Sequence, residues 1–147
     1  LLKGRRSLLQ SKFNAGIVEL WTACRWQGSK TMDKVAVVIP NYNGYRYLET
    51  CFAALAKQTF TEFTTYFVDN GSQDESCAFL REHYPETKII QLDDNYGFSR
   101  AVNEGIRQSK EPYVILLNND TEVSRTLSSA FMRESVKERM RLHAAQS

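Results

Sequence analysis

Short apolar runs alternate with longer stretches of helical periodicity through the middle of the chain. Four of these runs are rich in β-branched and aromatic residues and show little polar alternation. We predict a strand at each of them, and the runs at 35–40 and 112–118 are expected to be buried, the latter at the centre of a sheet covered on both faces. They are "VAVVIP" at 35–40, "FTTYFVD" at 63–69, "KIIQL" at 88–92 and "PYVILLN" at 112–118.

The stretches between these runs predict three helices. Ser72, with Glu75 three residues later, matches the capping-box pattern and is expected to open the second helix. Strands that alternate with helices favour parallel pairing and right-handed crossovers. We therefore predict an α/β fold with a doubly wound, mainly parallel, Rossmann-like sheet. The first helix is expected over 45–57, the second ends near Tyr84, and the third follows Gly97 over about 98–109.

The net charge of +2 conceals three parts of different charge. Residues 1–32 carry a net charge of +5, residues 33–123 of −6 and residues 124–147 of +3. We interpret the acidic middle part as the folded domain, the first part as a basic N-terminal extension and the last as an atypical basic tail. Hydrophobic residues at 42% and charged residues at 24% are ordinary for a globular domain and exclude wholesale disorder.

The N-terminal extension leaves two interpretations open. Its tryptophans and arginines suit a basic segment that touches an anionic membrane surface, and the alternative is an extension without a folded role. No apolar run approaches the ~18 residues of a spanning helix, and no signal-peptide core is present. Cys24, Cys51 and Cys77 are scattered and are expected to be free thiols in a reducing compartment. We expect a cytoplasmic protein, with peripheral contact at the inner face of the membrane as a further interpretation.

Each predicted strand runs into a loop of hydrogen-bonding residues. In open α/β sheets, ligands bind beyond the carboxyl ends of the strands. Turn chemistry alone places Asn, Asp and Gly in loops, but four such loops at one edge favour a binding site. The loops are Pro40-Asn41-Tyr42-Asn43-Gly44, Asp69-Asn70-Gly71-Ser72, Asp93-Asp94-Asn95-Tyr96-Gly97 and Asn118-Asn119-Asp120.

Four of these loop and helix residues suit a nucleotide. Tyr42 is expected to stack on a base, with Pro40 fixing the direction of the chain beneath it. Asp69 is an acceptor-only carboxylate suited to a ring N–H or a ribose hydroxyl. Arg100 is interpreted either as a contact to phosphate or as a solvated surface residue.

The last loop suggests a metal ion. Asp120 follows an apolar strand, and its carboxylate suits Mg²⁺ or Mn²⁺, which take oxygen ligands and share them with substrate phosphates. Such a cation would offset the repulsion between an acidic domain and a diphosphate. Asn118 and Asn119 are interpreted either as neutral oxygen ligands or as residues that only orient the turn.

Missing motifs narrow the alternatives. The chain has no G-x-G-x-x-G after its first predicted strand and no G-x-x-x-x-G-K-[ST], which argues against a dinucleotide cofactor and a P-loop. His83 and His143 are isolated, so no zinc site is indicated. A receiver-like signalling domain remains a weaker alternative, because the lysine that it needs after a later strand is absent. We expect no nucleic acid among the partners.

Four sequence blocks together resemble a family 2 glycosyltransferase with the GT-A fold. The blocks occur in that family's order and at its spacing, over about residues 35–123. The resemblance implies inverting transfer of a sugar from a UDP- or dTDP-linked donor to a glycan or a lipid-linked glycan acceptor. The blocks are "VAVVIPNYNGYRYLETCFAALAKQTF", "FVDNGSQDES", "DDNYGFSRAVNEGI" and "YVILLNNDTEV".

The resemblance also assigns roles to residues. It places Asn118-Asn119-Asp120 at the position of the family's D-x-D motif, with Asp120 as the metal ligand, and "NND" there is similar to rhamnosyltransferase-like members. The donor-binding residues that it implies, together with those suggested by chemistry, are Pro40, Tyr42, Asn43, Asp69, Asn95, Gly97, Arg100, Asn118 and Asn119.

The same resemblance implies that the chain is a truncated donor-binding half. The family's general base lies many tens of residues beyond residue 123, so no catalytic base is assigned and we expect the isolated chain to be inactive. A nucleotide-sugar-binding module without catalysis is the alternative. For the tail we weigh a change of reading frame near Ser124 against a genuine basic helix at 126–142.

Overall fold

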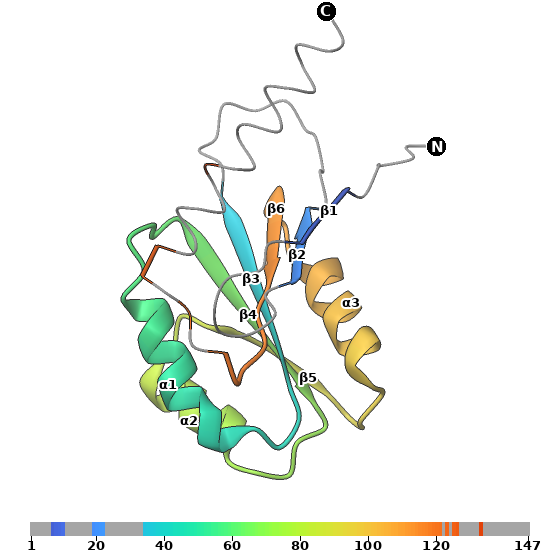
Figure 1. Ribbon diagram of the computed structural model, residues 1–147. Helices are drawn as coiled ribbons and strands as arrows, with labels where there is room; N and C mark the ends of the chain where they lie inside the picture. Colours follow the sequence, from blue (N-terminus) through green and yellow to red (C-terminus); the bar gives the residue numbers. More distant parts are fainter. Residues whose placement is uncertain are drawn as a thin grey trace, which may run out of the picture.

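The computed structural model describes residues 7–10, 19–22, 34–121, 123, 125, 126 and 133. Within these residues, six strands form one sheet and three helices pack against it (Figure 1). The strands are β1 (Ser7–Gln10), β2 (Glu19–Thr22), β3 (Val35–Asn41), β4 (Phe63–Asn70), β5 (Lys88–Leu92) and β6 (Tyr113–Leu116). The helices are α1 (Tyr45–Ala56), α2 (Ser76–His83) and α3 (Phe98–Gln108).

Four strands pair in parallel, which confirms the predicted α/β fold. The sheet order is β1-β2-β6-β3-β4-β5, with β3 parallel to both β4 and β6, and β4 parallel to β5. The chain first moves outward from β3 to β4 and β5, and then returns to the other side of β3 with β6. The strand order therefore reverses between β3 and β6, and such a reversal is where open α/β sheets bind ligands.

Helices cover both faces of the sheet, as the doubly wound prediction requires. On one face, Val37 and Ile39 of β3 pack with Leu48 of α1 and Leu80 of α2. On the other face, the alternate residues of β3 pack against α3 (Figure 1). Gly105 brings α3 close, because a Cβ at this position would lie 2.5 Å from Val38 Cγ1. All seven residues of β3 are buried, which explains why the apolar run alone predicted this strand.

Two short strands that the sequence did not predict extend the sheet beyond β6. β2 pairs antiparallel with β6, with Leu20 opposite Ile115 and Trp21 opposite Val114. β1 in turn pairs antiparallel with β2. The rest of the N-terminal extension, including Cys24, lies outside the described residues. The interpretation of this extension as a membrane contact therefore stays a prediction.

The capping-box prediction at Ser72 is wrong. Helix α2 begins at Ser76, four residues later, and the Ser76 N–H donates to Asp74 Oδ1 at 3.0 Å. The Ser72 hydroxyl oxygen instead accepts the Asn43 N–H at 2.9 Å. A tertiary contact with the loop after β3 has thus replaced the local contact that the pattern indicated.

The chain turns back toward α1 after β6. β6 is shorter than the predicted strand at 112–118, although the Leu117 N–H still donates to the Val38 carbonyl at 2.9 Å. The Arg125 carbonyl then accepts the Thr59 N–H at 2.9 Å. Most of the basic tail, and with it the helix weighed at 126–142, lies outside the described residues. Among the helices that the structure describes, none is both long and apolar enough to cross a bilayer.

Candidate functional site

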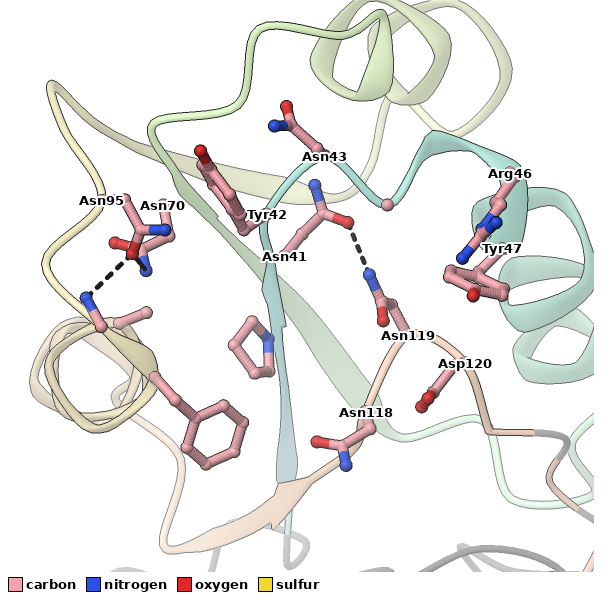
Figure 2. A pocket seen from close by; sticks show the side chains of 15 residues that line it. Asn41, Tyr42, Asn43, Arg46, Tyr47, Asn70, Asn95, Asn118, Asn119 and Asp120 are labelled. Atoms are coloured by element: carbon pink, nitrogen blue, oxygen red, sulfur yellow. Dashed lines mark hydrogen bonds between the residues drawn. The ribbon is translucent and has the colours of Figure 1, made fainter.

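A pocket of about 570 Å³ opens at the carboxyl ends of β3 and β6, at the reversal of strand order (Figure 2). The reversal leaves a crevice there because the connecting segments diverge. Its lining is mostly amide, aromatic and backbone groups. The lining residues are Pro40, Asn41, Tyr42, Asn43, Gly44, Arg46, Tyr47, Asn70, Asn95, Gly97, Phe98, Ala101, Asn118, Asn119 and Asp120.

The structure gathers most of the predicted site residues in this lining. Asp69 and Arg100 are not among them, and their contact with a donor stays a prediction. Sequence reasoning had not assigned a role to Arg46, Tyr47 or Phe98, which also line the pocket. The predicted residues that line the pocket are Pro40, Tyr42, Asn43, Asn95, Gly97, Asn118, Asn119 and Asp120.

Asn41, the last residue of β3, joins the two sides of the pocket. Its side chain is buried, with 3% exposure. The Asn41 Oδ1 accepts a hydrogen bond from Asn119 Nδ2 at 2.6 Å (Figure 2). The Asn41 Nδ2 points the other way, toward Ser72 Oγ at 3.1 Å, Ser76 Oγ at 3.2 Å and Asp69 Oδ1 at 3.4 Å. One buried amide therefore connects the loop after β6 to the end of β4.

The two residues after Asn41 form the rim. Tyr42 is 50% exposed, so its ring is available for stacking in a pocket that it lines. Asn43 has a φ of 47°, a left-handed conformation that asparagine adopts more readily than most residues. Its Oδ1 accepts the Gln73 N–H at 2.8 Å, which stabilises this turn. Asn43 thus holds the tight turn that leaves Tyr42 at the surface.

Gly44 lies where the loops after β3 and β6 come close together. A Cβ at this position would lie 2.2 Å from Asn119 Nδ2 and 2.4 Å from Asn41 Oδ1. Its φ of −104° is open to any residue, so close packing rather than backbone conformation calls for glycine here. The Asn41–Asn119 hydrogen bond therefore requires a residue without a side chain at position 44.

The opposite wall of the pocket is a second amide pair, at the ends of β4 and β5. Asn70 Nδ2 donates to Asn95 Oδ1 at 2.9 Å (Figure 2), and Asn70 Oδ1 accepts the Tyr96 N–H at 3.0 Å. Asn95 Oδ1 also accepts the N–H of Gly97, which has a φ of 86°. Glycine adopts a positive φ at little cost, which explains its place here. Gly97 directly precedes helix α3, beside the pocket.

Arg100 packs outside the pocket lining. Its guanidinium lies over the Tyr96 ring, 3.8 Å from the centroid. The Tyr96 hydroxyl donates to Asp93 Oδ1 at 2.8 Å, and this hydrogen bond raises the pKa of the Tyr96 phenol. These contacts order the surface of the loop after β5. They engage the arginine that the sequence analysis interpreted either as a contact to phosphate or as a solvated surface residue.

Asp69 is buried and is not among the residues that line the pocket. Its side chain is 2% exposed and accepts the hydrogen bond from Asn41. Burial, helped by the Asp69 charge and a hydrogen bond to it, raises the pKa of the Cys77 thiol to about 12. Asp69 therefore acts in this structure on the side chains that support the pocket.

Asp120 is the carboxylate that faces solvent in the pocket lining, beside the amides of Asn118 and Asn119 (Figure 2). Burial raises the pKa of the nearby Cys51 thiol to about 12, with a smaller contribution from the Asp120 charge. In the part of the chain that the structure describes, no three His, Cys, Asp or Glu side chains converge. One carboxylate with neighbouring amide oxygens suits a hard cation that takes its remaining ligands from phosphate and water.

Comparison with known proteins agrees with this geometry. The sequence model for "Glycosyl transferase family 2" matches residues 36–139, which extends past the boundary that the resemblance gave. A glycosyltransferase of Escherichia coli, YibD, is 30% identical over 109 residues, 72% of this chain and 31% of that protein.

Two solved structures have the same fold. Staphylococcus aureus TarS in complex with UDP-GlcNAc matches with a TM-score of 0.62 and 27% identity, over 69% of this chain and 31% of that one. A mannosyltransferase of Pyrobaculum calidifontis, in complex with GDP-Man and Mn²⁺, matches with a TM-score of 0.54 over 62% of this chain and 28% of that one. At 20% identity, this second likeness concerns the fold alone. The chain spans about a third or less of the curated relatives that it matches.

Proposed function

Because the chain belongs to glycosyl transferase family 2, we propose that its pocket binds a nucleoside diphosphate sugar, the donor of an inverting glycosyltransferase. The observation that carries this proposal is the meeting of an exposed aromatic ring, Tyr42, and an exposed carboxylate, Asp120, in one pocket at the reversal of strand order. The donor is UDP- or dTDP-linked, and the UDP-GlcNAc complex of TarS supports the first of these.

Different lining residues bind different parts of the donor. Tyr42 stacks on the base, and the Asn70–Asn95 pair borders the nucleoside side. Arg46, in the first turn of α1, is the cation of the lining and attracts the diphosphate. Asp120, with the amides beside it, holds Mg²⁺ or Mn²⁺, and the bound cation neutralises phosphate charge. The Mn²⁺ complex of the mannosyltransferase with the same fold is consistent with such a cation.

The acceptor and the general base require residues beyond this pocket. Among the residues that the structure describes, the lining contains no histidine, cysteine or glutamate, and we assign its one aspartate to the cation. A base must lie within hydrogen-bond reach of the acceptor hydroxyl, and its loss costs a factor of ~10²–10⁴ in rate. The isolated 147-residue chain therefore binds the donor without transferring it to a glycan or a lipid-linked glycan.

Isothermal titration calorimetry tests this assignment. UDP and dTDP are titrated into the chain with Mn²⁺ and with EDTA, and one of them is expected to bind only when Mn²⁺ is present. Asp120→Ala removes the carboxylate and should abolish the Mn²⁺-dependent binding. Glu82→Ala is the matched control, because it removes an exposed carboxylate of α2 outside the pocket lining.

Two results would contradict the proposal. Equal affinity in Asp120→Ala and in the unsubstituted chain would remove Asp120 from the cation site. Formation of a glycoside by the isolated chain would mean that a general base lies within it. The proposal that the chain binds the donor without transferring it would then be wrong.

A further inference from the structure

A buried carboxylate, a buried amide and a half-buried amide form a directional series of hydrogen bonds at the carboxyl edge of the sheet. Asp69 accepts from Asn41 Nδ2 at 3.4 Å, and Asn41 Oδ1 accepts from Asn119 Nδ2 at 2.6 Å. Asp69 and Asn41 are 2% and 3% exposed, so water is not available to replace these partners. An unsatisfied buried polar group is costly, and the series is therefore expected to keep one direction.

A carboxylate sets that direction because it only accepts hydrogen bonds. An amide has a donating and an accepting end, so Asn41 must turn its Nδ2 toward Asp69 and its Oδ1 toward Asn119. Asn119 must then turn its Nδ2 toward Asn41. Figure 2 shows the oxygen of the Asn119 amide turned away from Asn41.

We propose that Asp69 orients the Asn119 amide through Asn41, so that the amide oxygen, and not its NH₂ group, is offered to the cation site beside Asp120. The inference rests on the proposed function for the cation, but the orientation of the amides is a property of the chain itself. Asp69 and Asn41 are then positioning residues. Gly44 belongs to the same arrangement, because any side chain there would displace the Asn41–Asn119 contact.

According to this proposal, replacing either asparagine of "NND" by aspartate changes Mn²⁺-dependent UDP binding in opposite directions. Asn118→Asp adds a carboxylate beside Asp120 outside the series of hydrogen bonds, and should tighten Mn²⁺-dependent UDP binding several-fold. Asn119→Asp adds the same charge, but it sets a second acceptor 2.6 Å from Asn41 Oδ1. It should weaken that binding by roughly tenfold, the order expected when a buried group loses its partner.

A rescue experiment tests the orientation without any ligand. In Asn119→Asp, Asn41 has an acceptor on both sides, and the urea midpoint should fall. Adding Asp69→Asn gives Asn41 a donor on the β4 side, so that the whole series can reverse. The Ser72 and Ser76 hydroxyls can donate as well as accept and are compatible with either direction. The double variant should recover at least half of the lost midpoint.

The outcomes separate this inference from the proposed function. If Asn119→Asp tightens UDP·Mn²⁺ binding as Asn118→Asp does, or if Asp69→Asn lowers the midpoint of Asn119→Asp further, the inference is wrong. Either result leaves the Asp120 assignment standing. If the unsubstituted chain binds no nucleotide with Mn²⁺, the proposed function fails, and the urea rescue still decides the orientation of the amides. Asn103→Ala, an exposed asparagine of α3, is the control for the loss of an amide elsewhere.

Discussion

Substituting Gly44 by alanine adds one methyl group where the loops after β3 and β6 meet. The new Cβ would lie 2.2 Å from Asn119 Nδ2 and 2.4 Å from Asn41 Oδ1, closer than any real Cβ contact. Because the φ of −104° suits alanine, backbone strain does not contribute. The substitution therefore breaks the 2.6 Å hydrogen bond between the two amides and leaves a buried carbonyl oxygen without its donor.

The size of the effect follows from two opposing terms. An unsatisfied buried acceptor costs about 1–3 kcal/mol. The reduced freedom of the unfolded chain on replacing glycine returns about 0.4–1 kcal/mol. We expect a net loss of about 1–2 kcal/mol in the free energy of unfolding. With a urea m-value of about 2 kcal/mol/M, the middle of the usual range, the unfolding midpoint should fall by about 0.5–1 M.

Urea unfolding followed by tryptophan fluorescence and by circular dichroism measures this shift. Asn119→Ala removes the nearer of the two clashing groups, so Gly44→Ala should cost less in that background than in the unsubstituted chain. A midpoint that stays the same or rises in Gly44→Ala would refute the close approach. Equal costs in the two backgrounds would show that Gly44 acts through some contact other than the one with Asn119.

Two further predictions concern the base and the thiols. Tyr42→Ala should weaken nucleotide binding by about 1–3 kcal/mol in calorimetry, whereas Tyr42→Phe, which keeps the ring, should bind nearly as tightly as the unsubstituted chain. In a Cys24→Ser background, a thiol reagent at pH 8 should label Cys51 and Cys77 only after unfolding, because burial raises both pKa values to about 12. Unfolded thiols ionise near pH 9 and folded ones near 12, so the unfolded chain binds fewer protons in this range and stability should fall as pH rises through it. Rapid labelling of the folded chain, or an unfolding midpoint that rises with pH there, would contradict the burial of these cysteines.

The two central strands, β3 and β6, were predictable because a strand that is buried on both faces has a continuous apolar run. β3 is the clearest case, since none of its seven residues faces water. β1 and β2 were missed because each has only four residues, and because β2 joins the sheet by pairing with the distant strand β6. The start of α2 was misplaced because the Ser72 hydroxyl is bonded to Asn43, a contact that no local pattern contains.

Most residues of the site were predictable from the loops at the strand ends, but the contacts between their side chains were not. Asp69 and Asn70 are neighbours in β4, and successive residues of a strand point to opposite faces of the sheet. Sequence reasoning chose Asp69 as an acceptor-only carboxylate, whereas it is Asn70 that lines the pocket, and the buried Asp69 accepts a hydrogen bond from Asn41. The Asn41–Asn119 bond joins residues 78 positions apart, and only the fold brings them together.

A crystal structure of the chain with UDP and Mn²⁺ tests the central claim most directly. The account predicts the nucleotide in the pocket between β3 and β6, with the base against the Tyr42 ring and the cation on the Asp120 carboxylate. A nucleotide bound at another part of the surface, or a cation bound without Asp120, would contradict it.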